Sequence, residues 1–244
     1  MTDRTPPEID LTGVAYAPGG VSVLRDITLS LTQRRIGIVG RNGSGKTSLA
    51  RIMAGLMAPD QGQVRIAGVD VAKDRKAALG VIGILFQNPD HQIIFPTVEE
   101  EIAFGLTQMG QSGAEVTAAV QAILARFDKA HWARAAIHQL SQGQRQLVCL
   151  MAVLAMRPRV IILDEPFAGL DIPTTRQLAR MLAGLQVTLL HITHDPNAVR
   201  AYDRVLWLEE GAVVQDGPAH QVLANFETRM IELGDGDDLS DLAG

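Results

Sequence analysis

The sequence is poor in cysteine, in aromatic side chains and in long apolar runs. Its one cysteine, Cys149, cannot form an internal disulfide, and it lies in the apolar run 147–156. A small residue on a buried helix is its expected role, which fits a reducing, cytoplasmic compartment. Aromatic residues make up 4% of the chain, so a protein that stacks many exposed bases is disfavoured.

An excess of positive charge is also missing. Lys and Arg number 22 against 27 Asp and Glu, which gives a net charge of −5 and disfavours broad contact with nucleic-acid phosphates. The longest apolar run is about half of the ~20 residues that a membrane-spanning helix needs. The first eight residues have no apolar stretch of a secretory signal. We expect a chain that stays outside the membrane and attaches to one only through a partner.

The order of apolar runs predicts an α/β fold. Residues 9–39 alternate β-rich runs with turns. The segments 160–163 and 187–192 are apolar throughout, as buried parallel strands are. Residues 97–135 are helical in composition. We therefore expect an α/β core interrupted by a helical subdomain at about 89–150.

The end of the chain has a different composition. Residues 233–244 are acidic and rich in glycine, which is typical of a flexible segment. We expect one main domain over residues 1–225 and a flexible acidic tail over 226–244.

A glycine-rich loop at 40–47 carries the first chemical motif. It fits the P-loop pattern G-x-x-x-x-G-K-[ST] and lies between a predicted strand and a predicted helix. Its backbone N–H groups would cradle phosphates, at which the next helix points its positive end. Lys46 would reach the β- and γ-phosphates, and the Thr47 hydroxyl would bind Mg²⁺. The predicted nucleotide-binding residues are Gly40, Asn42, Gly43, Ser44, Gly45, Lys46, Thr47 and Ser48.

Two carboxylates close the apolar run 160–163. Asp164 and Glu165 would lie at the carboxyl edge of a parallel sheet, where open α/β folds bind ligands. Asp164 is predicted to hold Mg²⁺, and Glu165 to orient and polarise the attacking water. A solvated pair at a strand end is the alternative, which the P-loop makes the weaker one.

The segment Leu140-Ser141-Gln142-Gly143-Gln144 opens a long apolar helix and resembles the signature of ATP-binding cassette (ABC) ATPases. The family's other landmarks follow its order along the chain. They are Tyr16 for adenine stacking, Gln87 in the Q-loop, the D-loop Ala168-Gly169-Leu170-Asp171 and the switch residue His194. Gln142 and Ala168 depart from the commonest forms of the signature and the D-loop, as functional members also do.

The resemblance covers about residues 9–220 and implies fold, cofactors and roles. The implied fold is a RecA-like P-loop NTPase core with an antiparallel β subdomain and a helical ABC subdomain. ATP and Mg²⁺ are the implied cofactors. Gln87 would act in catalysis and bind the metal, His194 would contact the γ-phosphate, and Asp171 would serve the nucleotide site. Ser141, Gly143 and Gln144 would contact ATP held by a second ABC protomer, so that ATP joins two cassettes head to tail.

Several landmarks keep an alternative interpretation. Tyr16 can be an ordinary strand tyrosine, and Val23, a second candidate for the adenine site, an ordinary core valine. His194 can be a core histidine, although its acidic neighbour at a strand end favours the phosphate contact. His191 is expected to be structural. The run Glu99-Glu100-Glu101 is expected to form a solvated helix face at a helix N-terminus.

The segment 86–105, which begins Phe86-Gln87-Asn88-Pro89-Asp90, looks like the ATPases of energy-coupling factor (ECF) transporters. That resemblance implies import of a vitamin or metal ion, with a membrane scaffold (T component) and a substrate-binding membrane subunit as partners. The compact length favours a biotin-type over a cobalt-type system. The ATPase would lie at the cytoplasmic face of the membrane, in a homo- or heterodimer.

The alternative is a soluble ABC ATPase of DNA repair, chromosome structure or translation. Repair and chromosome members need a long coiled coil between the two halves of the cassette. Residues 88–139 are too few for one, and they show no sustained heptads. Translation-type members carry two cassettes in one chain, whereas this chain has one. The sequence therefore favours transport.

Overall fold

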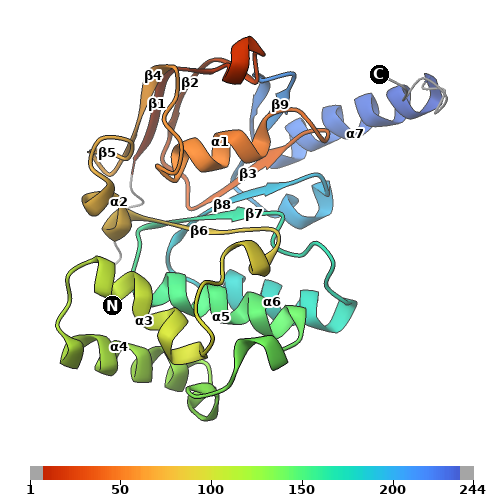
Figure 1. Ribbon diagram of the computed structural model, residues 1–244. Coiled ribbons are helices and arrows are strands. Elements are labelled where there is room, and N and C mark those ends of the chain that lie inside the picture. The colour runs from red at the N-terminus through yellow and green to blue at the C-terminus, as the bar shows by residue number, and fades with distance from the viewer. Residues whose placement is uncertain (1–7, 237–244) are drawn as a thin grey trace.

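The computed structural model describes residues 8–236, which form two β-sheets with helices around the larger one (Figure 1). The strands are β1 (Ile9–Tyr16), β2 (Leu24–Leu31), β3 (Arg35–Val39), β4 (Gln61–Ile66), β5 (Val69–Asp70), β6 (Ile82–Leu85), β7 (Val160–Asp164), β8 (Thr188–Thr193), β9 (Arg204–Glu209) and β10 (Ala212–Gly217). The α-helices are α1 (Lys46–Met53), α2 (Arg75–Val81), α3 (Val98–Gln108), α4 (Gly113–Arg126), α5 (Gln142–Ala155), α6 (Ile172–Ala183) and α7 (Ala219–Gly236).

The smaller sheet is antiparallel, with strand order β2-β1-β4-β5. The larger sheet has the order β10-β9-β3-β8-β7-β6. Strands β9, β3, β8, β7 and β6 run parallel, and β10 joins β9 antiparallel as the edge strand. These features confirm the predicted α/β core with its antiparallel β subdomain.

Strands β3, β7 and β8 of the larger sheet are buried on both faces, which explains their largely apolar sequences. Val160 and Ile162 belong to the core cluster that packs α1 and the antiparallel sheet onto one face. Ile161 and Leu163, which alternate with them, belong to the cluster formed with α3, α4, α5 and α6 on the other face. Figure 1 shows these helices together below the sheet and α1 above it.

The helical region after the Q-loop packs as a unit through α3, α4 and α5. Cys149 is fully buried there, and burial raises the pKa of its thiol to about 12, so it is a protonated core residue as expected. Among the described residues, no helix has the length and apolar character needed to cross a membrane.

The structure differs from the predicted tail over residues 226–236. Helix α7 runs through the expected boundary at 226 to Gly236. The cause is Phe226, which is buried and makes an edge contact with Trp207 of β9, with ring centroids 5.6 Å apart. Burying these two rings stabilises the helix across the boundary. The rest of the predicted tail, 237–244, lies outside the described residues.

Candidate functional site

The P-loop connects β3 to α1 and depends on glycine at two tight positions. A Cβ at Gly40 would lie 2.2 Å from the Leu208 carbonyl oxygen. Gly45 has φ +99°, and its Cβ would lie 2.8 Å from the Val23 carbonyl oxygen. Any larger residue would force both the loop and its neighbours to move. The loop therefore wraps closely around the start of α1, as the sequence predicts.

Lys46, the first residue of α1, is almost fully buried. Its Nζ donates to the carbonyl oxygens of Gly40 (2.7 Å) and Arg41 (2.8 Å). Burial lowers the pKa of Lys46, and the nearby carboxylates of Glu165 and Asp164 oppose that shift. The Ser44 hydroxyl is buried and has no hydrogen-bond partner among the described residues. An ammonium held by carbonyls beside an unmatched hydroxyl suits a bound phosphate, which can replace these contacts.

Asp164 ends β7 and is buried beside the P-loop helix. Its Oδ1 accepts from the Thr47 hydroxyl at 3.4 Å. Burial raises the pKa of Asp164; the Thr47 hydrogen bond acts in the opposite direction, and the negative charge of Glu165 raises it further. The Thr47 hydroxyl and the Asp164 carboxylate are hard oxygen donors of the kind that suits Mg²⁺ together with nucleotide phosphates.

Glu165 lies in the turn after β7 with φ +48°, in the left-handed region. Its carboxylate accepts from the Thr193 hydroxyl (3.1 Å) and the His194 backbone N–H (2.7 Å). The His194 Nδ1 lies 2.7 Å from Glu165 Oε1. The last residue of β8 and the residue after it thus hold the carboxylate that follows β7. A non-glycine residue in this conformation is strained, so the surrounding contacts must fix it.

These groups line one cleft of about 340 Å³. Its lining residues are Val23, Asn42, Gly43, Gly45, Lys46, Thr47, Ser48, Gln87, Glu165 and His194. Gly40 and Asp164 contact the lining through the hydrogen bonds described above. Tyr16 does not line this cleft: it is half-buried against the core of the antiparallel sheet, and its carbonyl accepts from the Val23 N–H at 2.8 Å.

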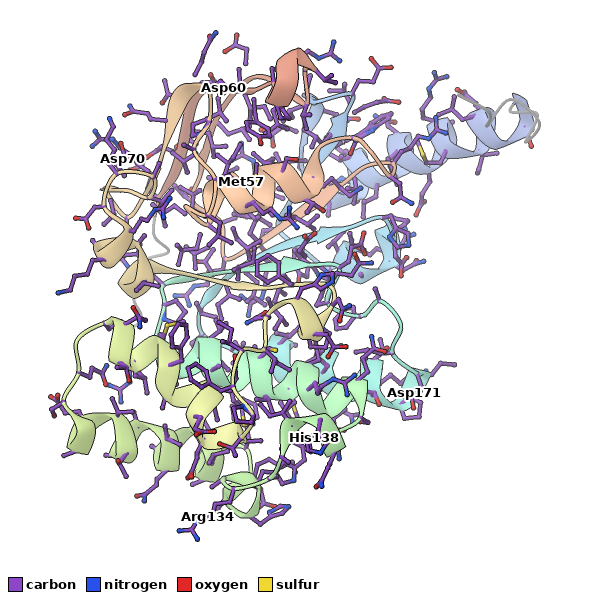
Figure 2. All side chains as sticks on the ribbon, viewed as in Figure 1. Met57, Asp60, Asp70, Arg134, His138 and Asp171 are labelled. Atoms are coloured by element: carbon purple, nitrogen blue, oxygen red, sulfur yellow. The ribbon has the colours of Figure 1, made fainter. Side chains whose placement is uncertain are left out.

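The signature and the D-loop lie outside this cleft. Ser141 caps α5: its hydroxyl accepts from the Gln144 N–H (3.3 Å), and its own N–H donates to Gln144 Oε1 (2.8 Å). Asp171 caps α6 by accepting from the Thr174 N–H at 2.8 Å. Figure 2 shows Asp171 on the opposite side of the large sheet from α1. These predicted contacts to nucleotide are therefore not brought into the cleft by their own chain.

The signature and the D-loop are nevertheless packed on each other. Gln142 Nε2 donates to the Ala168 carbonyl oxygen at 3.3 Å. A Cβ at Gly143 would lie 2.3 Å from Thr174 Cγ2, so glycine allows α6 to approach this closely. The two motifs form one surface at the N-termini of α5 and α6, where backbone N–H groups favour an anion.

Sequence reasoning missed the roles of two residues, one at the cleft and one in the segment after Gln87. Thr193 binds Glu165, and its place directly before His194 at the end of β8 is the signal that could have found it. Glu101 was expected on a solvated face, but it is buried and its Oε2 accepts the N–H groups of Ile94 (2.8 Å) and Phe95 (2.9 Å). The run of three acidic residues suggested that all three are exposed, but only Glu99 and Glu100 are.

The fold and the cleft define a P-loop nucleotide hydrolase. A family model described as ABC transporter matches residues 24–168. The chain is 51% identical over 222 residues to the biotin transport ATP-binding protein BioM of Rhodobacter capsulatus, covering 91% of this chain and 95% of that protein. It is 40% identical over 219 residues to the BioM of Rhizobium etli, covering 90% and 96%. The chain belongs to the ABC transporter family, and it binds and hydrolyses ATP.

Two solved structures of ATP-binding cassettes have a similar fold. One is cbiO1 of Clostridium perfringens, part of the ABC transporter complex cbiONQ, with TM-score 0.76 and 30% identity over 92% of this chain and 94% of that one. Another is a dimeric ATP-binding cassette in a post-hydrolysis state with ADP and Pi, with TM-score 0.73 and 25% identity over 86% and 98%.

Proposed function

We propose that this chain is the ATPase of an ECF-type transporter that imports biotin, and that it works as half of an ABC dimer at the cytoplasmic face of the membrane. The observation that carries the proposal is the 51% identity to a biotin transport ATP-binding protein across almost the whole chain. The ECF assignment is supported by the likeness to a subunit of the cbiONQ complex and by the sequence after Gln87.

Within the cleft, Glu165 orients and polarises the water that attacks the γ-phosphate. His194, whose Nδ1 lies 2.7 Å from Glu165 Oε1, contacts that phosphate beside the carboxylate. Lys46 neutralises the β- and γ-phosphates. Mg²⁺ would be held by Thr47, Gln87 and Asp164, and when bound it would neutralise charge on the transferred phosphoryl group.

The site is half of a composite one. Ser141 and the backbone of Gly143 lie outside the cleft of their own chain, on an exposed surface with the D-loop. In the proposed dimer this surface closes the cleft of the other protomer, with Gln144 and Asp171 beside it. ATP then holds the two chains together, and hydrolysis releases them. The partner is a second ABC protomer, identical or related.

A second cleft, of about 360 Å³, suits a helix of the membrane scaffold. It is lined by Asp90, Ile93, Phe95, Pro96, Ile137, His138 and Arg145. Beside it, the Ile94 side chain is 67% exposed. Phe95 instead packs on Phe104, with ring centroids 5.2 Å apart. Because Gln87 lies in the ATP cleft three residues before Asp90, nucleotide state can reach the docking cleft directly.

A soluble ABC ATPase of the repair or chromosome type is the competing function. Between Gln87 and Leu140 the structure has α3 (11 residues), α4 (14 residues) and three short 3₁₀ turns. Both helices pack into the same core as α5, so neither can serve as a projecting coiled coil.

The test is biotin uptake and co-purification of membrane proteins with Ile94→Ser. This side chain is exposed, so ATP binding and melting temperature should stay near wild type, while complex formation and uptake fall. Ile231→Ser is the matched control, because Ile231 is 65% exposed on α7. Full uptake and an unchanged complex in Ile94→Ser would remove this segment from the docking surface. An intact wild-type complex that does not take up biotin would contradict the assignment of biotin as the substrate.

A further inference from the structure

Two neighbouring side chains of α5 hold the loop that carries Gln87. Gln146 is 1% exposed, and its Nε2 donates to the Phe86 carbonyl oxygen at 3.1 Å. Arg145 Nε forms an ion pair with Asp90 Oδ1 at 2.9 Å. The residue before Gln87 and a residue shortly after it are therefore both attached to the helix that begins at the signature.

The loop between these attachments is a compact unit. Gln92 Oε1 accepts from the Phe86 N–H at 3.2 Å and closes the loop. Asn88 Oδ1 accepts from the Asp90 N–H at 2.9 Å and caps the 3₁₀ turn η2 (Pro89–His91). A shift of Gln87 at the γ-phosphate cannot be absorbed within so tightly bonded a segment. It must move Asp90 as well.

Arg145 connects this unit to the signature. Its Nη1 donates to the Leu140 carbonyl oxygen at 2.7 Å. Leu140 directly precedes Ser141, which is the N-cap of α5. One guanidinium thus joins Asp90, in the Q-loop segment, to the residue that positions Ser141. Arginine suits this role because its fixed fork of donors can serve two acceptors at once.

These ties are firm but incompletely satisfied. The Arg145 side chain is 22% exposed, and its Nε faces Asp90 without the alignment of a hydrogen bond. Gln146 Oε1 is buried with no hydrogen-bond partner in the described part of the chain. A buried polar atom without a partner destabilises the arrangement in which it lies. A shifted position of the loop in which these atoms find partners can therefore compete with the present position. A bound ligand can then select between the two positions, as in a two-state element.

We propose that Arg145, supported by Gln146, is a positioning residue that transmits the position of the Q-loop to Ser141 of the same chain. Because Ser141 serves the partner's ATP in the function proposed above, on which this inference rests, the tie makes the two ATP sites of a dimer interdependent. Arg145 and Asp90 also line the proposed docking cleft, so the membrane partner acts on the same tie.

The experiment measures ATP-driven dimerisation of the full chain by light scattering in a Glu165→Gln background, where ATP is consumed slowly. Asp90→Asn and Arg145→Met should each raise the ATP concentration at the midpoint about tenfold, within the usual range of coupling between sites. ATP affinity of the dilute monomer should change less than about twofold, because neither residue lines the ATP cleft. The double variant should be no worse than Arg145→Met alone, because the two residues act through one contact.

Arg126→Met is the matched control, since Arg126 is an exposed arginine of α4. Midpoints of Asp90→Asn and Arg145→Met equal to that control would overturn the tie. Additive losses with lowered melting temperatures would also overturn it, since they indicate a structural role. Ser141→Arg separates the two proposals. If it blocks dimerisation while the other variants behave normally, the composite site stands and the tie fails. If it dimerises normally, the composite site itself fails.

Discussion

The ATP cleft and the signature surface differ in how far their own chain completes them. In the cleft, Lys46, Asp164 and Glu165 are held by contacts from the P-loop, α1 and β8. On the signature surface, Ser141 and Asp171 only cap their own helices. A completed cleft on one side of the sheet and an exposed pair of helix N-termini on the other fit a protein whose second surface completes the site of a partner chain. The predictions below test that difference.

The largest effect is expected for Glu165→Gln. The amide keeps one oxygen, which can accept from either Thr193 or His194, but it loses the charge that polarises water. Hydrolysis should fall by about 10²–10⁴, with ATP affinity retained, since the P-loop contacts remain. Steady-state ATPase assays and nucleotide titration check this. Near-normal turnover would show that another group activates the water.

Ser141→Arg should abolish ATP-driven dimerisation. A long cation at the N-terminus of α5 opposes the helix dipole and blocks approach of a second protomer. The monomer should bind ATP as wild type does, because Ser141 does not line the cleft. Size-exclusion chromatography with and without ATP measures the first effect, and nucleotide titration the second. Loss of binding by the monomer would place Ser141 in its own chain's site.

Acid should lower the free energy of unfolding through His191. This residue of β8 is buried between Phe167 and Tyr202, and burial lowers its pKa from 6.5 to about 4. Because the pKa is lower in the folded chain, the unfolded chain binds the proton at a higher pH than the folded chain does. Stability is therefore full above about pH 6.5 and is lost as pH falls toward 4, by about 2 kcal/mol at pH 5. Urea unfolding at pH 7.5 and pH 5 measures it.

The matched variant for this experiment is His191→Asn, which has no titrating ring. Its loss of stability between the two pH values should be smaller than that of the wild type by about the same 2 kcal/mol. An identical loss in both proteins would assign the acid sensitivity to other groups.

The smallest effect separates capping from function. Ser112 forms a capping box with Glu115 at the start of α4, with the same arrangement as Ser141 and Gln144. Ser112→Ala and Ser141→Ala should each lower the free energy of unfolding by about 1 kcal/mol. Only Ser141→Ala should also weaken ATP-driven dimerisation. Equal effects of both variants on dimerisation would reduce the role of Ser141 to a helix cap.

Motifs carried within one short segment were predictable. The strand, glycine loop and helix around Lys46, and the buried strand ending in Asp164 and Glu165, follow from local spacing, because each motif contains its own geometry. The alternation that places Val160 and Ile161 on opposite faces of the sheet is equally local. The family resemblance added Gln87 and His194, which the structure brings into the same cleft as Lys46.

Contacts between distant segments were not predictable. Glu101 was expected to be a solvated charge, but it binds the backbone N–H groups of Ile94 and Phe95. The start of the expected tail is helical, and Phe226 packs there against Trp207. The sequence by itself determined the P-loop between β3 and α1 and the two carboxylates at the end of β7, since backbone conformation and strand ends are local properties. Only the tertiary structure decided that the signature surface faces away from that cradle, because this depends on how α5 and α6 pack against the opposite face of the sheet.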